Sequence, residues 1–349
     1  MSVKIAQVGC GYWGVNLLRV FSHVAKITAV VEENRKTIDN VKKINPNARF
    51  EENLDETLKS RNIDALVIAT PAKTHYDIAK KALLHDKHVF VEKPLATNTE
   101  EARELIKLSK QKNRVLMVGH TFLYNQAVRM LHDYVQNNEI GRVYYCYSQR
   151  LNLGRVRTDI NAMWNFAPHD ISIISYVLDK KAVRVWAHGN CYIQQDIEDL
   201  AFVTIEYEDG VLGHIHVSWL DPNKTRQMTI VGEDKMIVYN DMIEAKLAIY
   251  DKGVNQLNNQ APQGGLGAWQ LTTRSGDILL PKVDFKEPLL IEAGHFIDCI
   301  IKGEKPLTDG HNGLQTVSIL EAAQKSLKNN GRCEMIEQTE EMGKSKVDK

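Results

Sequence analysis

The sequence predicts an α/β protein in which a helix-covered parallel sheet is followed by a larger, open, mainly antiparallel sheet. The first 120 or so residues alternate short apolar runs with segments of helical period, which is typical of βαβ units. After residue 120 the apolar pattern changes to a period of two, as in hairpins. A glycine-rich sequence joins the first apolar run to the first helical segment. A chain of 349 residues is long enough for about two domains.

The first region is expected to hold strands that are buried on both faces, because helices cover a parallel sheet on each side. The short apolar runs are Val3–Val8, Ile27–Val31, Ala65–Ala69, His88–Val91 and Val115–Val118. The helical patterns between them are Gly14–His23, Arg35–Lys43, Leu54–Ser60, Thr74–His85 and Thr99–Gln111. Together they predict a nucleotide-binding type of α/β domain over residues 1–121.

The second region is expected to form another α/β domain over residues 122–335, followed by a charged tail over 336–349. Its strand patterns are Arg142–Leu151, Ala182–Ala187, Leu200–Tyr207, Val211–Trp219, Gln227–Val231 and Met236–Tyr239. Its helical patterns are Gln126–Val135, His169–Leu178, Leu290–Ile301 and Gly313–Lys328. Residues 253–276, rich in Gly, Asn and Gln, are expected to form a long loop. One face of an antiparallel sheet can meet solvent or another subunit.

Composition argues against several classes of protein. The chain has 44 Lys and Arg against 44 Asp and Glu, so no overall positive field attracts nucleic acid or an anionic membrane. No apolar run reaches the roughly 18 residues that span a bilayer, and the N-terminus lacks the pattern of a signal peptide. The five cysteines are scattered without metal-ligand spacing. We expect a cytoplasmic protein with no metal, no nucleic-acid partner and no membrane association.

The glycine-rich sequence Gly9-Cys10-Gly11-Tyr12-Trp13-Gly14 has the GxGxxG spacing of a dinucleotide-binding turn. In that turn the first glycine permits the tight bend, the second lets the backbone approach the pyrophosphate, and the third allows close packing of helix on strand. We therefore expect Gly9, Gly11, Tyr12, Trp13 and Gly14 to contact a cofactor.

Glu32 ends the second strand, where an acidic side chain binds the adenosine ribose. Its charge would repel the 2′-phosphate of NADP, so we expect NAD. Arg35 could accept that phosphate and keeps NADP as an alternative.

Two further motifs follow strand ends, at the edge where ligands bind in such sheets. Thr70 and Pro71 follow one strand, and Glu92 and Lys93 end or follow another. We expect all four to contact the cofactor. His75, on the next helix, is a further candidate for which a structural role is the alternative.

These motifs together resemble the Gfo/Idh/MocA oxidoreductases. The similarity rests on GCGYWG, on ATPAKTHYDIAKKALLHDKHVFVEKPLA, on VGHTFLYN, on APHD and on the closing HFIDCIIKGEKPLTDGHNGLQTVSILEAAQKSL, and it covers nearly the full length. The resemblance implies an N-terminal Rossmann domain that binds NAD and a C-terminal domain whose open sheet forms a homodimer or homotetramer interface.

The resemblance also implies two catalytic residues. Lys93 matches the lysine of the family's EKP motif, whose ammonium can hold the reacting hydroxyl and stabilise negative charge on its oxygen. His169 matches the family's catalytic histidine, expected at the start of a helix, and an imidazole can take the hydroxyl proton near neutral pH. Many members carry an aspartate four residues earlier, where this chain has Asn165. The histidine therefore lacks that negative charge unless Asp170 supplies one.

The segment from Asn152 to Trp164 is most similar to the branch of the family that oxidises UDP-N-acetylglucosamine, or its glucuronate, at C3 of the sugar. Arg155 and Arg157 offer cations to a diphosphate, and Trp164 or Tyr124 could stack on a sugar or base. Asn161, Asn165, Asn125 and His169 complete the candidate substrate residues. Salt bridges or packing are the alternative roles for these side chains. The alternative functions are oxidation of a free polyol or hexose, and a non-catalytic dinucleotide-sensing regulator.

Overall fold

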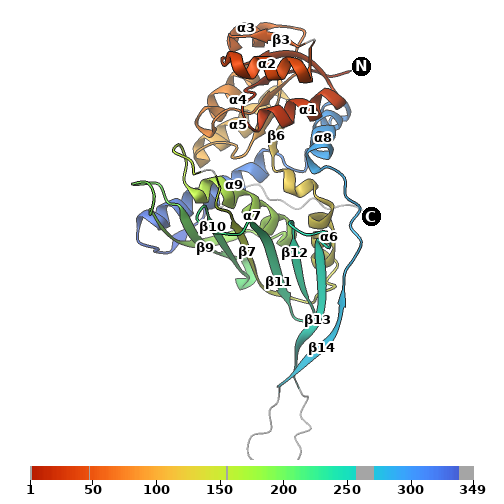
Figure 1. The fold of residues 1–349 in the computed structure, drawn as a ribbon, viewed down its shortest axis with the longest axis vertical. Helices are drawn as coiled ribbons and strands as arrows, with labels where there is room; N and C mark the ends of the chain where they lie inside the picture. Colours follow the sequence, from red (N-terminus) through yellow and green to blue (C-terminus); the bar gives the residue numbers. More distant parts are fainter. Residues whose placement is uncertain (1, 47, 155, 257–270, 338–349) are drawn as a thin grey trace, which may run out of the picture. The chain divides into compact units, whose positions relative to one another are not determined.

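The computed structural model describes residues 2–46, 48–154, 156–256 and 271–337, which form two compact units. The first unit comprises the described residues of 1–124, 286–321 and 337–349, and the second comprises those of 125–285 and 322–336. Helix α9 (Gly310–Lys328) is divided between these ranges. Figure 1 labels the α-helices of both units and many of their strands.

The first unit contains a six-stranded parallel sheet with the order β3-β2-β1-β4-β5-β6. The strands are β1 (Lys4–Val8), β2 (Lys26–Val31), β3 (Arg49–Glu51), β4 (Ala65–Ile68), β5 (His88–Glu92) and β6 (Leu116–Gly119). The helices are α1 (Gly14–Val24), α2 (Arg35–Ile44), α3 (Leu54–Lys59), α4 (His75–Leu84), α5 (Thr99–Lys112) and α8 (Pro288–Lys302), with short 3₁₀ turns η1 (Ala72–Thr74) and η2 (Thr121–Tyr124). This strand order is that of a doubly wound, Rossmann-type fold, which confirms the predicted class.

Strand β3 is absent from the sequence-based prediction. Its three residues pair with Ala29–Val31 of β2 at the edge of the sheet. Arg49 and Glu51 are charged, so this segment has no apolar run that could indicate a strand. Its pairing with β2 makes it a strand, since strand preference depends on the neighbouring strand more than on the residue.

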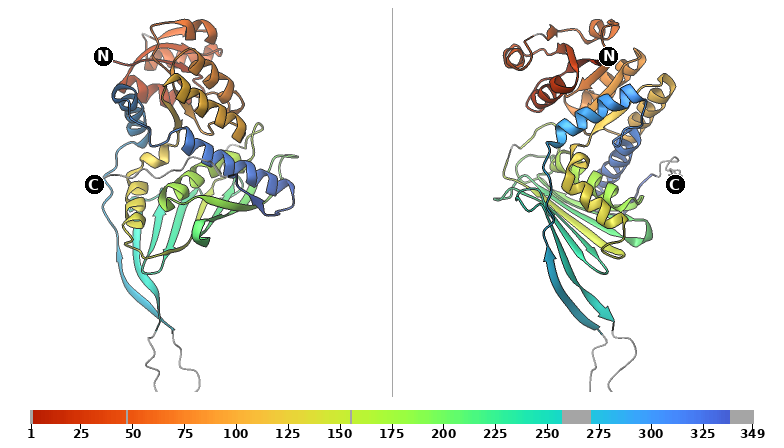
Figure 2. Two further views of the ribbon diagram at one scale, coloured as in Figure 1. Left: turned by 180° about the vertical axis from the view of Figure 1, so that it is seen from behind. Right: turned by 90° about the vertical axis from the view of Figure 1, so that its right-hand side faces the viewer.

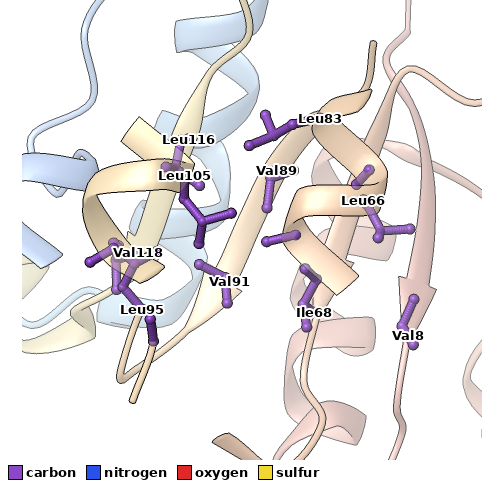
Figure 3. Close-up of a cluster of buried hydrophobic side chains, with 14 of the residues drawn as sticks. Val8, Leu66, Ile68, Leu83, Val89, Val91, Leu95, Leu105, Leu116 and Val118 are labelled. Atoms are coloured by element: carbon purple, nitrogen blue, oxygen red, sulfur yellow. The ribbon is translucent and has the colours of Figure 1, made fainter. Parts of the chain in front are cut away.

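Side chains along β5 alternate between two separate cores, one on each face of the sheet. Val89 and Val91 belong to the apolar cluster drawn in Figure 3. Phe90 lies on the opposite face and packs edge-to-face against Phe21 of α1 and Phe296 of α8, with ring centroids 5.3 to 6.0 Å apart. Helix α8, which the sequence suggested as part of a domain over 122–335, therefore completes the core of the first unit.

The second unit contains a nine-stranded mixed sheet with the order β14-β13-β12-β11-β7-β10-β9-β8-β15. The strands are β7 (Val143–Leu151), β8 (Ala182–Asn190), β9 (Leu200–Tyr207), β10 (Leu212–Ser218), β11 (Thr225–Gly232), β12 (Met236–Asn240), β13 (Leu247–Gln256), β14 (Leu271–Leu279) and β15 (Glu334–Met335). Strands β7 and β10 are parallel, and the other neighbouring pairs are antiparallel. The prediction of a mainly antiparallel second sheet is confirmed.

Helices cover one face of the second sheet and leave aromatic side chains on the other. Helix α7 (Ala162–Leu178) packs on β7, β9 and β10, and α6 (Gln126–Gln136) packs on β12. The register of these strands places Tyr145, Tyr147, Phe202 and Leu212 together on the opposite face, where all four are exposed. The period-two apolar pattern that predicted these strands therefore also predicted a sheet face that no helix covers.

Strands β13 and β14 and helix α7 of the second unit differ from the sequence-based prediction. Within the expected loop over 253–276, β13 continues to Gln256 and β14 begins at Leu271, while 257–270 lie outside the described residues. The two strands extend as a hairpin past the neighbouring strands (Figure 2), because backbone pairing does not require apolar side chains. Helix α7 begins at Ala162 rather than at His169, because the Asn161 side chain caps its N-terminus and Pro168 is accommodated inside it.

No helix among the described residues is long and apolar enough to cross a membrane. In the same part of the chain, no three or more His, Cys, Asp or Glu side chains are grouped so that they could hold a metal ion.

We predict that Phe296→Ala lowers the free energy of unfolding by about 3–5 kcal/mol, the usual cost of removing a buried ring and leaving a cavity. Urea denaturation followed by circular dichroism measures this change. Leu84→Ala is the control, because Leu84 is 50% exposed on α4 and its loss should change stability by less than about 0.5 kcal/mol. Equal effects of the two substitutions would contradict the assignment of α8 to this core.

Candidate active site

The glycine loop after β1 combines two tight backbone contacts with one open position. Gly9 has a φ of 84°, and a Cβ atom there would lie 2.7 Å from the carbonyl oxygen of Ala69. A Cβ atom on Gly14 would lie 2.4 Å from the carbonyl oxygen of Gly9. At Gly11 nothing lies within 4 Å of a Cβ position. Gly9 and Gly14 are therefore required by packing, whereas Gly11 leaves room for a ligand beside the backbone.

The start of α1 is suited to a phosphate group. No acidic residue occupies its first turn, and no side chain caps its N-terminus. The first amides of a helix favour an anion, because they carry partial positive charge and point out of the helix end. Tyr12 and Trp13, which precede the helix, are both exposed. The loop and helix therefore fit the pyrophosphate of a dinucleotide.

Glu32 lies directly after β2, beside the glycine loop. Its carboxylate accepts hydrogen bonds from the backbone N–H of Cys10 at 2.8 Å and of Asn34 at 2.9 Å. These bonds fix the carboxylate and leave further lone pairs for ribose hydroxyls. The negative charge opposes a 2′-phosphate, which agrees with NAD rather than NADP. The side chain of Arg35, which could favour NADP, lies outside the described part of the chain.

His75 joins the turns that follow β4 and β5. Its ring nitrogens lie 2.7 Å from the carbonyl oxygen of Pro94 and 2.9 Å from that of Thr70. Burial lowers the pKa of His75, and the contacts of its ring with the two carbonyl oxygens oppose that change. Thr74 donates to the Thr70 hydroxyl at 2.8 Å and to the Pro71 carbonyl at 2.8 Å. These contacts hold His75 between the two turns, and a cofactor contact by His75, Thr70 or Pro71 stays a prediction.

Glu92, the last residue of β5, connects Lys93 to the glycine loop. The indole N–H of Trp13 donates to its Oε1 atom, and the backbone N–H of Lys93 donates to Oε2 at 3.2 Å. Burial raises the pKa of Glu92 to about 7, although the Lys93 charge and these hydrogen bonds oppose the rise. The carboxylate lies over Gly119, where a Cβ atom would be 3.1 to 3.3 Å from its atoms.

Two further buried side chains interact with Glu92 or Lys93, and the first of them, Glu292, was not predicted as a site residue. Glu292 of α8 is fully buried and accepts a hydrogen bond from the Thr121 hydroxyl at 2.7 Å. Burial and the charge of Glu92 raise its pKa well above the usual range. His120 follows β6, and burial together with the Lys93 charge lowers its pKa to about 3. The available signal for Glu292 was an acidic residue within the apolar helical segment Leu290–Ile301.

His169 lies in the middle of α7 in the second unit, with Asn165 one helical turn before it. Residues four apart share a helix face, and both residues are partly exposed. Asp170 points to the buried side, where both of its carboxylate oxygens accept hydrogen bonds from the Arg150 guanidinium at 2.6 and 3.4 Å. Asp170 therefore belongs to a buried ion pair and does not take the place of the aspartate that many relatives have at position 165.

Asn161 and Trp164 are held within the second unit at the start of α7. The Asn161 side chain accepts from the Trp164 N–H at 2.9 Å and donates to Glu198 at 2.7 Å and Gln324 at 2.9 Å. The Trp164 indole donates to the same Gln324 oxygen at 3.1 Å. These polar groups stabilise the fold, and a role for either residue in substrate binding stays a prediction.

The remaining candidate substrate residues that the structure describes also have partners in the fold. Tyr124 is buried with its hydroxyl 3.2 Å from that of Thr308. Asn125 caps α6 and donates to the Tyr239 hydroxyl at 3.3 Å. Arg157 forms a bidentate ion pair with Asp159 at 2.8 and 2.5 Å, so its charge is balanced locally. Arg155 lies outside the described residues.

Comparison with known proteins agrees with this site. The family described as "Oxidoreductase family, NAD-binding Rossmann fold" matches residues 3–120, and the GFO/IDH/MocA C-terminal domain matches residues 128–238. UDP-N-acetylglucosamine 3-dehydrogenase of Acidithiobacillus ferrooxidans is 25% identical over 72% of this chain and 78% of its own. The scyllo-inositol 2-dehydrogenase (NAD(+)) of Bacillus subtilis is 24% identical over 94% of each chain.

Other curated relatives are matched over only 59–60% of their own length. Among solved structures, a levoglucosan dehydrogenase in complex with NADH superposes with a TM-score of 0.82 at 20% identity, covering 97% of this chain and all of the other. At this level of identity the superposition establishes the fold.

We predict that alanine at Gly9 lowers the stability of the protein, whereas alanine at Gly11 weakens cofactor binding. Gly9→Ala should lower the free energy of unfolding by about 2–4 kcal/mol, because the positive φ and the contact with Ala69 both oppose a Cβ atom. Gly11→Ala should leave the unfolding midpoint nearly unchanged and weaken NAD binding, because its methyl group enters the space kept for the pyrophosphate. Thermal denaturation and titration calorimetry measure the two effects. Destabilisation by Gly11→Ala would contradict this account of the loop.

Proposed function

Because the chain belongs to the GFO/IDH/MocA family of NAD-binding oxidoreductases, we propose that it oxidises a secondary hydroxyl of a nucleotide sugar, at C3, to a keto group. The observation that carries the proposal is the carboxyl edge of the first sheet. There the glycine loop, Glu32 and Lys93 follow β1, β2 and β5, at the edge where a doubly wound sheet binds a dinucleotide.

Lys93 and His169 divide the work on the reacting hydroxyl. NAD, when bound, accepts the hydride that leaves the sugar carbon. The Lys93 ammonium holds the hydroxyl oxygen and stabilises the negative charge that develops on it. His169 takes the hydroxyl proton as general base. Support for these roles is the match of each residue to a family motif, the EKP sequence for Lys93 and the APHD sequence for His169.

The nucleotide-sugar substrate is supported by the sequence between Asn152 and Trp164 and by the relative that acts on UDP-N-acetylglucosamine. A free polyol is the second candidate, and a specific observation favours it. Arg157, one of the two cations expected to bind a diphosphate, is already paired with Asp159, and a neutral polyol needs no such cation. A relative matched over 94% of both chains is named as an inositol dehydrogenase.

We also propose that the protein is a homo-oligomer that assembles through the bare face of the second sheet. Tyr145 and Tyr147 stack there at 6.4 Å between centroids, and Phe202 stacks on His216 at 4.4 Å. Exposed aromatic side chains grouped on one sheet face are typical of a protein interface.

Purified protein with NAD should produce NADH absorbance with UDP-N-acetylglucosamine or its glucuronate. Lys93→Ala and His169→Ala should each lower kcat at least about 100-fold, the usual contribution of a positioned acid or base, while the protein stays folded. Turnover with myo-inositol or glucose in place of UDP sugars would keep the mechanism and change the substrate. NAD binding without turnover on any of these compounds would contradict the dehydrogenase proposal for them and favour a regulator.

Phe202→Glu combined with Tyr147→Glu should reduce the molar mass measured by light scattering to that of one chain, because two carboxylates cannot be buried in an apolar contact without a large cost. Tyr192→Glu is the matched control, since Tyr192 is 62% exposed but lies outside the strands. A wild-type protein that is already monomeric would contradict the assembly.

A further inference from the structure

Two carboxyl groups are buried in the first unit close enough for the charge of one to act on the other, and the proposed reaction uses neither of them. Glu92 ends β5, and Glu292 comes from α8, far away in the sequence. Glu292 is fully buried and Glu92 nearly so, and the charge of Glu92 is strong enough at Glu292 to raise the pKa of that acid. Two carboxylates in such dry surroundings do not both ionise.

The surroundings of the pair place its single negative charge on Glu92. Both Glu92 oxygens accept hydrogen bonds from N–H groups, those of the Trp13 indole and the Lys93 backbone, and the Lys93 ammonium adds a favourable charge. Glu292 receives one bond, from the Thr121 hydroxyl, and its Oε1 atom has no hydrogen-bond partner among the described residues. A carboxylate is stabilised by N–H donors and a nearby cation. Glu292 is therefore the protonated acid of the pair.

The charge on Glu92 lies on the half of the sheet that takes the second nucleotide. In a doubly wound sheet each half binds one nucleotide of the dinucleotide, across the point where the strand order reverses. Here β1 and β2 carry the glycine loop and Glu32, which fit the adenosine half, so β4, β5 and β6 serve the nicotinamide half. Trp13 ties the Glu92 carboxylate to the glycine loop, and Gly119 is the residue that leaves room for it.

We propose that the single buried charge on Glu92, kept there by the protonated Glu292, makes the protein bind NAD⁺ in preference to NADH. The nicotinamide ring is cationic in the oxidised form and neutral in the reduced form, so a nearby carboxylate in a low-dielectric site attracts only the oxidised form. The preference promotes release of NADH after each oxidation. This inference rests on the NAD-linked function proposed above and concerns the cofactor alone.

The test measures the dissociation constants of NAD⁺ and NADH for the full-length protein by titration calorimetry at pH 8, without substrate. In Glu92→Gln the ratio Kd(NADH)/Kd(NAD⁺) should fall by about tenfold or more, as expected for removing one charge within about 12 Å of the nicotinamide at an effective dielectric constant of about 20. The amide also disturbs the bonds with Trp13 and Lys93. That disturbance affects both nucleotides alike, so the ratio reports the charge.

The same substitution at Glu292 should leave the ratio of dissociation constants nearly unchanged. In Glu292→Gln a neutral amide replaces a neutral acid, so the ratio should stay within about twofold of the wild-type ratio, well below the tenfold effect of removing a charge. Glu104→Gln controls for a general loss of negative charge. Glu104 is an exposed residue of α5 that forms an ion pair with Lys80. A fall in the ratio for Glu292→Gln equal to that for Glu92→Gln would overturn the assignment of the charge.

A measurement on the wild-type protein tests the proposal without any substitution. The groups that interact with Glu92 are Lys93, Trp13 and Glu292. His120 also interacts with Lys93 and is neutral, because burial and the Lys93 charge lower its pKa to about 3. Glu92 has a pKa of about 7, so it loses its charge as the pH falls. The ratio should therefore decrease between pH 8 and pH 6 in the wild-type protein and stay constant in Glu92→Gln.

The outcomes separate this inference from the proposed function. A ratio that is independent of pH and of Glu92, with both nucleotides still bound, would overturn the inference and leave the dehydrogenase proposal intact. Failure of the wild-type protein to bind either nucleotide would contradict the NAD-linked function itself. If Glu92→Gln does not fold, the pH series on the wild-type protein decides the question.

Discussion

The first unit depends on a close approach of backbone atoms at the switch point between β1 and β4. Gly9 lies against the carbonyl of Ala69, and Gly14 lies against the carbonyl of Gly9, so the start of α1 is pressed onto the ends of two strands. That contact brings the helix N-terminus to the carboxyl edge of the sheet. The anion site, the Glu32 carboxylate and the Trp13 contact with Glu92 all take their positions from it.

Buried ionisable groups in both units are held by specific partners. In the first unit Trp13 and the Lys93 backbone hold Glu92, and in the second unit Arg150 holds Asp170 directly beside His169 in the sequence. A buried charge is tolerated only when hydrogen bonds or an opposite charge replace its water. Glu92 and Asp170, which are adjacent in the sequence to the proposed catalytic residues Lys93 and His169, are thus each held in place by hydrogen bonds.

Local sequence was sufficient to predict those site residues that lie within one strand and the turn that follows it. The GxGxxG spacing, the acidic residue after β2 and the lysine after β5 each lie within one strand-turn segment, and the structure places all of them at one edge of the sheet. The same reasoning gave Asn161, Trp164 and Arg157 as substrate residues. In the structure they bond to Gln324, Glu198 and Asp159, and a residue type alone does not reveal such partners.

The sequence by itself therefore determined the fold class, the alternation of strands and helices in the first unit, the dinucleotide loop and the lysine motif, because each depends on periodicity or on residues a few positions apart. Only the tertiary structure decided that α8 completes the first core, that Glu292 faces Glu92, that Asp170 pairs with Arg150, and that part of a polar segment continues as the β13–β14 hairpin. These features join segments that are far apart in the chain or depend on backbone pairing. Their free energy comes from burial and from contacts that exist only after the chain has folded.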